Sequence, residues 1–381
     1  LVEDNEMLDE VVVVGYGVQK KSDVTGAMIR VGSEELNSRP VANAFEAMQG
    51  KAAGVDIVSN ERPGEVGTIN VRGVRSLSAS NTPLYVVDGI PLMSNSGIET
   101  LNPQDIESID VLKDASATAI YGSRGANGVI LVTTKSGKEG KMSLNYSGTV
   151  TIENLQDYSE MMNSAEYIDW RRWSYYYLNP SKYPRGDQPT KENDYEIFLG
   201  ATDPTAWKNI EKGWAGGTWD GSRVPNTDWC DMVTQTGVTH EHTLSASGGT
   251  DKMKGYASIG YLDNEGTVKG QSYTRYTTKL SLDLKPTKWF NLGLNVNGTF
   301  SEQQYGSSAS SVGQLIKGMP SNLYAASTSL FPYASPYDED GNRIEYPGGD
   351  DKVKNVMNEW NNSQNERRMF RAIGSLYAQL D

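Results

Sequence analysis

Only a few polar side chains in this sequence are spaced as metal ligands or reacting groups would be. His240 and His242 are the only histidines, and their spacing puts both on the same face of a strand. A metal site would need a further ligand from another segment, so a structural role for the pair is favoured over metal binding. Cys230 is the only cysteine, which excludes an internal disulfide and a metal site built from cysteines.

Two short segments are close to ligand-binding loops without matching them. The segment 338–342 is acidic, but its glycine comes too early for a calcium loop, and Asp-Gly is typical of a hairpin turn. The segment 15–22 is close to a phosphate-binding loop, but Lys20 stands where the second glycine should be. The sequence has no nucleophile elbow and no zinc motif. It also has no pair of carboxylates with neighbours that would assist acid–base chemistry. It therefore predicts no catalytic residue, no metal and no cofactor, and a protein that is not an enzyme.

The densest aromatic run is Trp170–Tyr177, which also contains two arginines. Flat rings stack on sugar faces and guanidinium groups bind carboxylates, so Trp170, Arg171, Trp173 and Tyr176 are candidate ligand contacts. The same spacing fits a short amphipathic helix whose rings pack on their neighbours. Packing is the favoured interpretation, with ligand contact for one face of the helix.

Charge and hydropathy limit the possible partners. A net charge of −13 argues against nucleic acid and against an anionic lipid surface. No apolar run approaches the roughly 18 residues that a transmembrane helix needs. A transmembrane β-barrel is not excluded, because only every second residue of its strands faces lipid.

Apolar and polar residues alternate in five segments after residue 140, as in strands with one apolar face. The apolar faces consist of Leu144, Tyr146, Val150 and Ile152; Leu244 and Ala246; Met253, Ala257, Ile259 and Tyr261; Tyr276, Leu280, Leu282 and Leu284; and Phe290, Leu292, Leu294, Val296 and Phe300. This pattern fits strands with lipid outside and water inside, although a soluble β-sandwich produces the same alternation.

The connections between these segments are sorted by length. Short turns at 248–251 and 285–288 fall at one end, whereas the long segments 153–236 and 301–366 fall at the other. Bacterial outer-membrane barrels have this asymmetry, with short periplasmic turns and long extracellular loops. Trp289 and Phe290 lie beside a short turn, where an interfacial aromatic girdle is expected. A sandwich has no reason to sort its loops in this way.

The preceding part of the chain has a different pattern. Between residues 21 and 140, short strands alternate with helical turns and glycine-rich loops, which predicts a small α+β domain. A helix is expected at 41–49 and strands at 55–59, 68–72 and 84–87. The stretch 101–134 is the most regular: a helix start at Asn102-Pro103, a strand at 109–112, a helical turn at 115–120 and a strand at 129–134.

Four motifs in this region carry a family resemblance: LDEVVVVGYG at 8–17, INVRGVRS at 69–76, PLYVVDGIPL at 83–92 and the stretch 101–134. In this order they resemble the plug domain of the SusC/RagA family of TonB-dependent outer-membrane transporters. The resemblance implies a flexible segment 1–20, an α+β plug at 21–140, and the first strands of a transmembrane antiparallel β-barrel at 141–381. It also implies an N-terminal fragment of a longer chain, whose barrel would have about 22 strands around the plug.

The resemblance assigns the TonB box to Leu8–Val14, that is, Leu8, Asp9, Glu10, Val11, Val12, Val13 and Val14. A tethered strand of this kind can add itself to the sheet of another protein, and in the family that protein is TonB. The alternative is that Val11–Val14 is an ordinary first strand of the plug.

The implied function is active import of oligomeric nutrients, beneath a SusD-like surface lipoprotein that acts as a lid. Cargo contacts are expected from polar plug loops, and the alternative is that these loops only connect strands; their candidate residues are Arg75, Ser76, Leu77, Ser80, Asn81 and Asn95. The aromatic run favours oligosaccharides, with oligopeptides as the other cargo class. Two alternatives remain: a lidless transporter of a siderophore or cobalamin, and a soluble β-rich binding or adhesive protein. The expected partners are TonB, the lipoprotein, the cargo and outer-membrane lipid, without nucleic acid.

Overall fold

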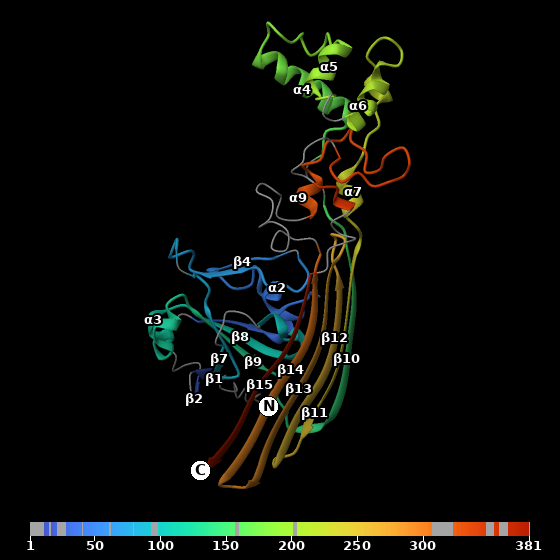
Figure 1. Ribbon diagram of the computed structural model, residues 1–381. Helices are drawn as coiled ribbons and strands as arrows, with labels where there is room; N and C mark the ends of the chain where they lie inside the picture. Colours follow the sequence, from blue (N-terminus) through green and yellow to red (C-terminus); the bar gives the residue numbers. More distant parts are fainter. Residues whose placement is uncertain are drawn as a thin grey trace, which may run out of the picture.

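The computed structural model describes residues 11–14, 17–20, 28–39, 41–60, 62–78, 80–92, 98–156, 160–200, 204–306, 323–347, 354–357 and 365–380. An N-terminal α+β unit lies along the concave side of a curved six-stranded sheet, and helices gather beyond one end of that sheet (Figure 1). We call the six-stranded sheet the wall and the group of helices the head. In the described part of the chain, no helix is long and apolar enough to cross a membrane.

The α+β unit is built on a five-stranded sheet with the order β3-β8-β9-β6-β7. Its strands are β3 (Met28–Gly32), β6 (Leu84–Val87), β7 (Ile90–Pro91), β8 (Ile106–Leu112) and β9 (Val129–Thr134). Strands β6 and β9 pair in parallel, and the other pairs are antiparallel. The separate ribbons are β1 (Val11–Val14) with β2 (Gly17–Lys20), and β4 (Val55–Val58) with β5 (Thr68–Val71).

Short helices cover this sheet. They are α1 (Ser33–Leu36), α2 (Ala44–Met48), η2 (Ile98–Thr100), η3 (Pro103–Asp105), α3 (Ala115–Thr118) and η4 (Ala119–Gly125). Helix α2 is shorter than the predicted 41–49, because the Asn43 side chain accepts hydrogen bonds from the backbone N–H groups of Phe45 and Glu46 and so begins the helix there. Helix η3 begins as predicted, with Asn102 as its cap and Pro103 in its first turn.

The two faces of this sheet carry separate apolar cores. The larger core contains Val31, Phe45 and Met48 together with Ile109 and Val132, so it joins strands and helices from both ends of the unit. The smaller core consists of Leu84, Val86, Leu112, Ala117, Val129 and Leu131. Burial of such side chains contributes about 1.5–3 kcal/mol each.

The wall consists of β10 (Gly140–Glu153), β11 (Gly237–Gly249), β12 (Met253–Glu265), β13 (Gln271–Thr287), β14 (Phe290–Tyr305) and β15 (Glu366–Leu380). Every neighbouring pair is antiparallel and follows the chain order. The predicted alternation is confirmed: Ile259 and Tyr276 on the convex face are 61% and 51% exposed, whereas Arg275 and Lys279 on the concave face are 1% and 2% exposed.

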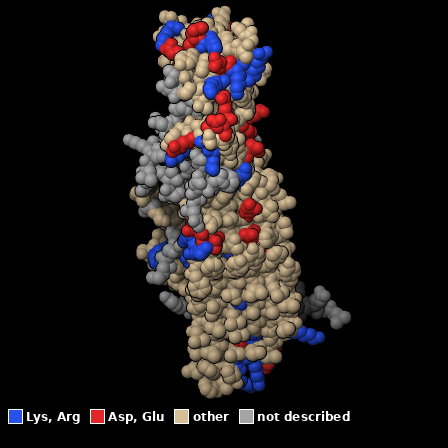
Figure 2. All heavy atoms as spheres, turned by 45° about the vertical axis from the view of Figure 1, so that its right-hand side comes forward, with Lys and Arg blue, Asp and Glu red and all other residues tan. Residues whose placement is uncertain are grey.

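The convex face is an apolar band between two rows of rings. His242, Tyr261, Tyr276, Phe300 and Phe370 are register partners on five neighbouring strands, and they form one row near the loop end. Trp289 and Phe290 lie at the turn end. The band between them is about ten residues long on a strand, or roughly 25 Å of thickness at a tilt of ~40°, as in outer-membrane barrels. Figure 2 shows few charged side chains across this band, with most of them in the head.

The head comprises the helices of the two long connections. The first connection holds α4 (Ser164–Leu178), α5 (Lys191–Ile197), α6 (Pro204–Glu211), η5 (Lys212–Trp214), η6 (Gly221–Arg223) and α7 (Trp229–Val233); the second holds α9 (Leu323–Ser327). Helix α4 has a capping box, in which Asn163 and Glu166 exchange side-chain to backbone hydrogen bonds. In Figure 1, α4, α5 and α6 stand farther from the wall than α7 and α9.

Candidate functional site

The concave face of the wall carries rows of polar side chains that meet the α+β unit. One row contains Thr243, Gly260, Thr277 and Thr299, which are register partners on β11, β12, β13 and β14. The next row towards the turn end contains Ser245, Ser258, Lys279 and Asn297. These rows face the segment 99–105, so the contact between the two parts of the molecule is polar.

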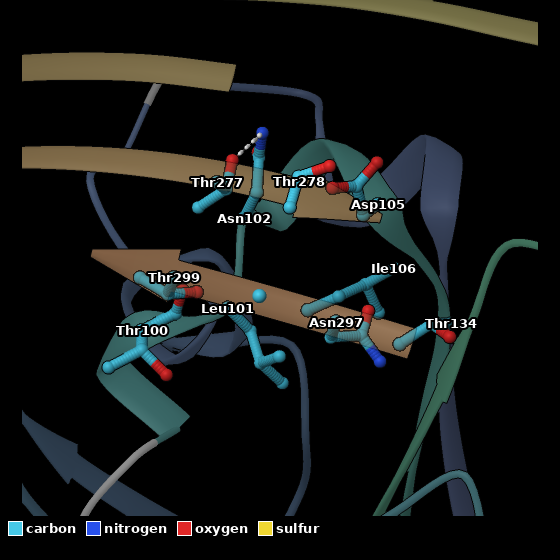
Figure 3. Close-up of a pocket in the computed structure, with 11 residues that line it drawn as sticks. Thr100, Leu101, Asn102, Asp105, Ile106, Thr134, Thr277, Thr278, Asn297 and Thr299 are labelled. Atoms are coloured by element: carbon cyan, nitrogen blue, oxygen red, sulfur yellow. Dashed lines mark hydrogen bonds between the residues drawn. The ribbon is translucent and has the colours of Figure 1, made fainter. Parts of the chain in front are cut away.

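Asn102 is inserted into the first of these rows (Figure 3). Its amide nitrogen donates to Oγ1 of Thr243 at 3.0 Å and of Thr277 at 3.4 Å, while its carbonyl oxygen caps η3 through the N–H of Gln104. Gly260 makes room for it, because a Cβ there would lie 2.5 Å from the Asn102 amide nitrogen. The absence of a side chain at one wall position therefore determines where the unit is seated.

Asp105, at the end of η3, is buried and bound from β12. Its Oδ1 atom accepts hydrogen bonds from the hydroxyls of Tyr256 at 2.8 Å and Ser258 at 2.5 Å. The backbone oxygen of Thr100 accepts from Thr299 Oγ1 at 3.0 Å. Residues 100–105 are thus fixed to four successive wall strands, β11, β12, β13 and β14.

Lys279 of β13 is the second point of attachment. Its ammonium group donates to Thr134 Oγ1, to Asn295 Oδ1 at 2.9 Å and to Asn297 Oδ1 at 3.4 Å. Asp88 supplies the counter-charge, with its Oδ2 atom 4.0 Å from the ammonium nitrogen. A buried cation must be paired in this way, and removal of one partner of a buried pair typically costs about 3–5 kcal/mol.

The turn between β6 and β7 directs Asp88 towards this cation. Asp88 and Gly89 both have positive φ angles, 46° and 81°, as in a type I′ hairpin turn. The Asp88 carboxylate then accepts from the backbone N–H of Thr134 at 2.8 Å and from its hydroxyl at 2.6 Å. Asn295 Nδ2 donates to the same carboxylate at 2.9 Å, which joins the turn directly to β14.

Arg275 lies on β13 four residues from Lys279, towards the loop end, and its contacts with the plug are to backbone carbonyls. Its Nη1 atom donates to the carbonyls of Ala42 and Glu99, both at 3.1 Å, and of Leu101 at 3.3 Å. Glu241 on β11 is its ion-pair partner, with a closest N–O distance of 3.5 Å. Gln303 of β14 makes the remaining contact of this kind, by donating to the Pro63 carbonyl at 2.8 Å.

A small cavity of about 10 Å³ remains among these contacts. It is lined mainly by threonine and amide side chains from both parts of the molecule, among them Thr100, Asn102, Thr134, Thr277 and Asn297 (Figure 3). Its size and polar lining suit a single water molecule. It is therefore part of the contact between the unit and the wall, and it is too small for a nutrient.

The candidate residues of the aromatic run lie on α4 and divide between its two faces. Trp170 is 53% exposed, and Trp173 stacks with Tyr177 and meets Tyr176 edge-on. Arg171 points into the head, where its guanidinium lies 5.5–5.8 Å from the ring centres of Tyr175, Phe198 and Phe331. Packing therefore accounts for Arg171, whereas Trp170 and Tyr177 are exposed and Trp173 and Tyr176 are half-buried.

Arg172 is the residue of this run that the sequence did not single out. It is buried and donates to both carboxylate oxygens of Asp194 on α5, at 2.9 and 2.6 Å. The Trp219 ring lies 3.9 Å from its guanidinium carbon. A twofold hydrogen bond between arginine and carboxylate is rigid, so this pair orients α4 against α5.

The two long connections fold together into one head. Trp229 Nε1 donates to the Phe331 carbonyl at 2.9 Å, and Asn209 Nδ2 donates to the Tyr333 carbonyl at 3.0 Å. Tyr333 is buried in the same core as Ile168 and Trp207.

The acidic segment 338–342 forms a turn, in which a hydrogen bond from the Asn342 backbone lowers the pKa of Asp338.

The candidate residues in the polar loop 75–81 are closed into a compact turn. Asn81 Oδ1 accepts from the backbone N–H groups of Arg75 at 2.8 Å and Ser76 at 2.9 Å, and the Arg75 side chain donates to the Ala126 carbonyl. Ser80 and Leu77 lie on the same loop, and Leu77 is fully exposed. Asn95 lies outside the described residues.

The valine segment is paired with its own neighbour. Val11–Val14 forms an antiparallel ribbon with Gly17–Lys20, and among the described strands this ribbon joins no other sheet. Leu8, Asp9 and Glu10 lie outside the described residues. A ribbon of two strands is marginally stable by itself, so this segment can be separated from its partner strand at low cost.

The histidine pair lies on one face of β11, as its spacing predicted, and that face is the convex one. His242 Nδ1 is 2.8 Å from the Tyr146 hydroxyl, and His240 Nε2 is 3.5 Å from Asp263 Oδ2. Both rings belong to a row of ring contacts that continues through Tyr261. In the part of the chain that the structure describes, no three His, Cys, Asp or Glu residues are grouped as metal ligands would be.

Comparison with known proteins agrees with this architecture. A family model described as TonB-dependent Receptor Plug Domain matches residues 20–129. The TonB-dependent receptor P26 of Formosa agariphila is 33% identical over 387 residues, an alignment that covers 99% of this chain and 34% of the relative. The TonB-dependent receptor SusC of Bacteroides thetaiotaomicron is 33% identical over 355 residues, which cover 88% of this chain and 31% of SusC. The chain belongs to the SusC/RagA family of TonB-dependent receptors.

A solved structure of this family has the same fold. The RagAB peptide importer in its "open-open" state superposes with a TM-score of 0.71 at 27% identity, covering 98% of this chain and 40% of the RagAB chain. This chain thus spans about a third of the length of the curated relatives P26 and SusC. In SusC/RagA terms, the α+β unit is the plug and the wall is part of an outer-membrane β-barrel. The family consists of transporters and not of enzymes.

In outer-membrane barrels the long loops lie outside the cell and the short turns lie in the periplasm. The residues that seat the plug, Asn102, Asp105, Arg275 and Lys279, were not among the predicted site residues. A signal for two of them was present, because Arg275 and Lys279 are cations on the polar face of a strand whose other face is apolar. A cation at such a position needs a buried partner or water, and here the partner is the plug.

Proposed function

We propose that this protein takes part in TonB-dependent import of an oligomeric nutrient across the outer membrane. The observation that carries the proposal is the seating of the plug: polar side chains of β11, β12, β13 and β14 hold it along the concave face of the wall. Similarity to SusC and to the RagAB peptide importer over nearly the whole chain supports the same function. A plug held by hydrogen bonds closes the barrel at rest and can be displaced by force.

The energy for import enters through Leu8–Val14, which we assign as the TonB box. TonB captures an extended segment by adding it to its own sheet, and backbone hydrogen bonds supply the affinity. The ribbon of β1 and β2 supports this assignment, because its outer edge is not paired with any other described strand. Cargo binding outside is coupled to exposure of this segment in the periplasm.

Cargo is bound between the head and the plug, beneath a SusD-like lipoprotein that acts as a lid. The contacts come from Trp170, Trp173 and Tyr176 of α4 and from the plug loop 75–81. Oligosaccharides are favoured as cargo because exposed rings such as Trp170 stack on sugar faces, and oligopeptides are the other class. Similarity to SusC and to the RagAB peptide importer supports the lid as a partner.

One experiment tests the partner and the cargo together. The full-length protein is tagged, extracted from outer membranes in mild detergent, and analysed by mass spectrometry for every protein and small molecule that copurifies. A lipoprotein with a bound oligosaccharide or oligopeptide is expected. A solitary chain that carries an iron chelate or cobalamin would overturn the lidded importer.

The TonB box is tested by deletion of Leu8–Val14. Growth on the copurified cargo should be lost, whereas assembly in the outer membrane and cargo binding should persist, because the deleted segment precedes the plug sheet. Normal growth after the deletion would contradict the assignment.

A further inference from the structure

Two lysines lie side by side on neighbouring strands at the turn end of the wall. The backbone N–H of Lys285, near the end of β13, donates to the carbonyl of Lys252, directly ahead of β12, at 2.7 Å. The next pair along these strands, Met253 with Leu284, belongs to the convex face. Because side chains alternate between the two faces, Lys252 and Lys285 lie on the concave side. We call these two lysines the rim, and Figure 2 shows basic side chains at this end of the wall.

The acidic side chains near the rim are already engaged. Glu139 lies 3.6 Å from the ammonium nitrogen of Lys254, and Asp283 accepts a hydrogen bond from the Tyr377 hydroxyl at 2.8 Å. Both rim lysines are exposed, and among the described residues no ion pair joins either of them to a carboxylate. Like charges directly opposite each other on a sheet are destabilising. The rim therefore favours an anionic partner from outside the described part of the chain.

The sequence ahead of the plug carries such charges. Residues 1–10, which we call the leader, contain no basic side chain and five acidic ones, namely Glu3, Asp4, Glu6, Asp9 and Glu10. The leader lies outside the described residues, and it joins the ribbon of β1 and β2 at Val11. In Figure 1 this ribbon lies on the turn-end side of the plug sheet, on the concave side of the wall. The leader thus starts on the same side of the plug as the rim, with a reach of about 33 Å.

We propose that the leader rests on the rim while TonB is not bound, with its carboxylates paired to Lys252 and Lys285. Charge complementarity is the first reason. The second is the tether, because attachment to β1 gives the leader an effective concentration on the order of millimolar at the rim. Exposed ion pairs are individually weak, so the leader exchanges between a docked and a free state.

Docking changes how TonB meets its target. The leader contains Asp9 and Glu10, which belong to the proposed TonB box, so TonB has to compete with the rim for the same segment. The rim therefore lowers the affinity of TonB for the resting transporter. This consequence rests on the proposed import, whereas the contact between leader and rim does not.

Anionic phospholipid is the other partner that a pair of lysines can bind. Its phosphates surround the convex face, where the exposed Trp289 marks the membrane boundary at the turn end. The rim lies on the concave side, so the wall stands between the rim and the lipid. The leader already starts on the concave side, and it is therefore the partner that the geometry favours.

A distance measurement between two spin labels tests the contact. The full-length protein, with Cys230 and any other cysteine replaced by Ser, carries one label at N5C in the leader and one at T287C, two residues from Lys285. It is measured without TonB or cargo, in vesicles of neutral phosphatidylcholine. The distance distribution should contain a narrow short component at low salt, and this component should disappear at high salt because screening weakens exposed ion pairs.

Neutralising the rim should abolish the short component, and K252Q/K285Q is the variant to measure. The matched control is K182Q/K191Q, which removes the same charge from two exposed lysines of the head. It should leave the short component unchanged, because the head is at the opposite end of the wall.

Exchange of the charges provides a rescue. K252E/K285E should abolish the short component, since the rim then repels the leader. Addition of E3K, D4K and E6K to that protein should restore it. Restoration also shows that the rim variants are folded.

Binding of the isolated C-terminal domain of TonB measures the consequence. Without cargo, K252Q/K285Q should bind this domain about two- to tenfold more tightly than the wild type, because two weak ion pairs no longer compete. K182Q/K191Q should bind it as the wild type does.

Three results would overturn the proposal. The first is an unchanged distance distribution in K252Q/K285Q, and the second is an equal loss of the short component in K182Q/K191Q. The third is loss of the short component when phosphatidylglycerol is added to the vesicles, which would make lipid the partner of the rim. An error in the proposed import would appear differently, as failure of the TonB domain to bind any variant while the spin-label distances stay as expected.

Discussion

Single residues decide how the plug is seated. Asn102 occupies space that exists only because position 260 of β12 has no side chain, and Asp88 reaches Lys279 only because its backbone adopts a positive φ. The first effect depends on the missing side chain at position 260 and the second on the backbone angle at position 88. A small substitution at either position should therefore change how firmly the plug is held. The outward residues of the same strands face lipid and are subject to a different constraint.

Gly260→Ala should loosen the plug without preventing barrel assembly. The new methyl group would lie 2.5 Å from the Asn102 amide nitrogen and 2.4 Å from Thr277 Oγ1, and overpacking of this kind costs about 1–3 kcal/mol. Faster protease cleavage of the plug in intact outer membranes would reveal it. Gly32→Ala is the control, because a Cβ at Gly32 meets nothing within 4 Å. Equal cleavage rates in the two variants would contradict the claim that Gly260 makes room for Asn102.

Glu46→Gln should stabilise the plug in a pH-dependent way. Burial raises the pKa of the Glu46 carboxyl above its usual 4.5, so the folded state favours the protonated form. Its contribution to stability is therefore greatest below the ordinary pKa and is lost as the pH rises through the raised value. Glutamine stays neutral and keeps an acceptor for Asn43.

Hydrogen exchange of the α2 amides measures this effect. The Glu46→Gln protein should exchange more slowly than the wild type at pH 8, and the difference should vanish near pH 4. The exposed Glu34 serves as the control in Glu34→Gln, for which no change is expected. If the Glu46→Gln protein exchanged more slowly than the wild type at pH 4 but not at pH 8, the predicted direction of the pH dependence would be wrong.

At the scale of elements, the strands were predictable and the long connections were not. Apolar and polar residues alternate over about ten residues in each of the five segments, and this alternation also showed which face is apolar. The pattern is local, because one face of the strand meets lipid and the other meets the plug. The strands are longer than predicted: β10 runs from Gly140 to Glu153, and β15 lies beyond the five segments. Their ends are polar on both faces outside the membrane, so alternation does not mark them.

The seat of the plug and the fold of the head depend on contacts between distant parts of the chain. Asn102 and Thr243 are 141 positions apart, and Trp229 and Phe331 are 102 positions apart. A local pattern cannot reveal such pairs. The aromatic run predicted a helix correctly, but the buried pair of Arg172 with Asp194 could not be distinguished from a surface arginine in sequence.

Val13→Pro should abolish uptake and leave the barrel and plug intact. Proline lacks the N–H that an added strand must donate to the TonB sheet, and it disfavours pairing in the middle of a strand. Binding of the isolated C-terminal domain of TonB to the purified transporter, together with growth on the copurified cargo, measures the effect. Val13→Ala keeps the N–H and should bind. Full binding by the proline variant would exclude Val11–Val14 from the TonB box.

At the scale of the whole molecule, rings and charges fix the depth of the protein in the membrane. The row that contains Tyr276 and Phe300 marks the outer boundary, and directly above it lie the contact of His240 with Asp263 and the ion pair of Arg368 with Glu302. Trp289 marks the inner boundary. Leu282 lies between them on β13, near the middle of the apolar band.

Leu282→Arg should destabilise the folded barrel by about 2–4 kcal/mol, the cost of a charged side chain near the bilayer midplane. Ser247→Arg is the matched control, because Ser247 lies at nearly the same depth but on the concave face. Urea unfolding of the full-length protein in lipid vesicles measures both. Similar stability losses in the two variants would contradict the assignment of the convex face to lipid.

The joined head also limits how cargo preference can change during evolution. Trp229 and Asn209 of the first connection bond to backbone carbonyls of the second, and Tyr333 of the second completes the core of the first. A graft that exchanges only one connection between relatives would expose these indoles and amides without partners. The two long connections therefore have to change together when cargo specificity changes. Recombination within the gene should keep matching pairs of connections.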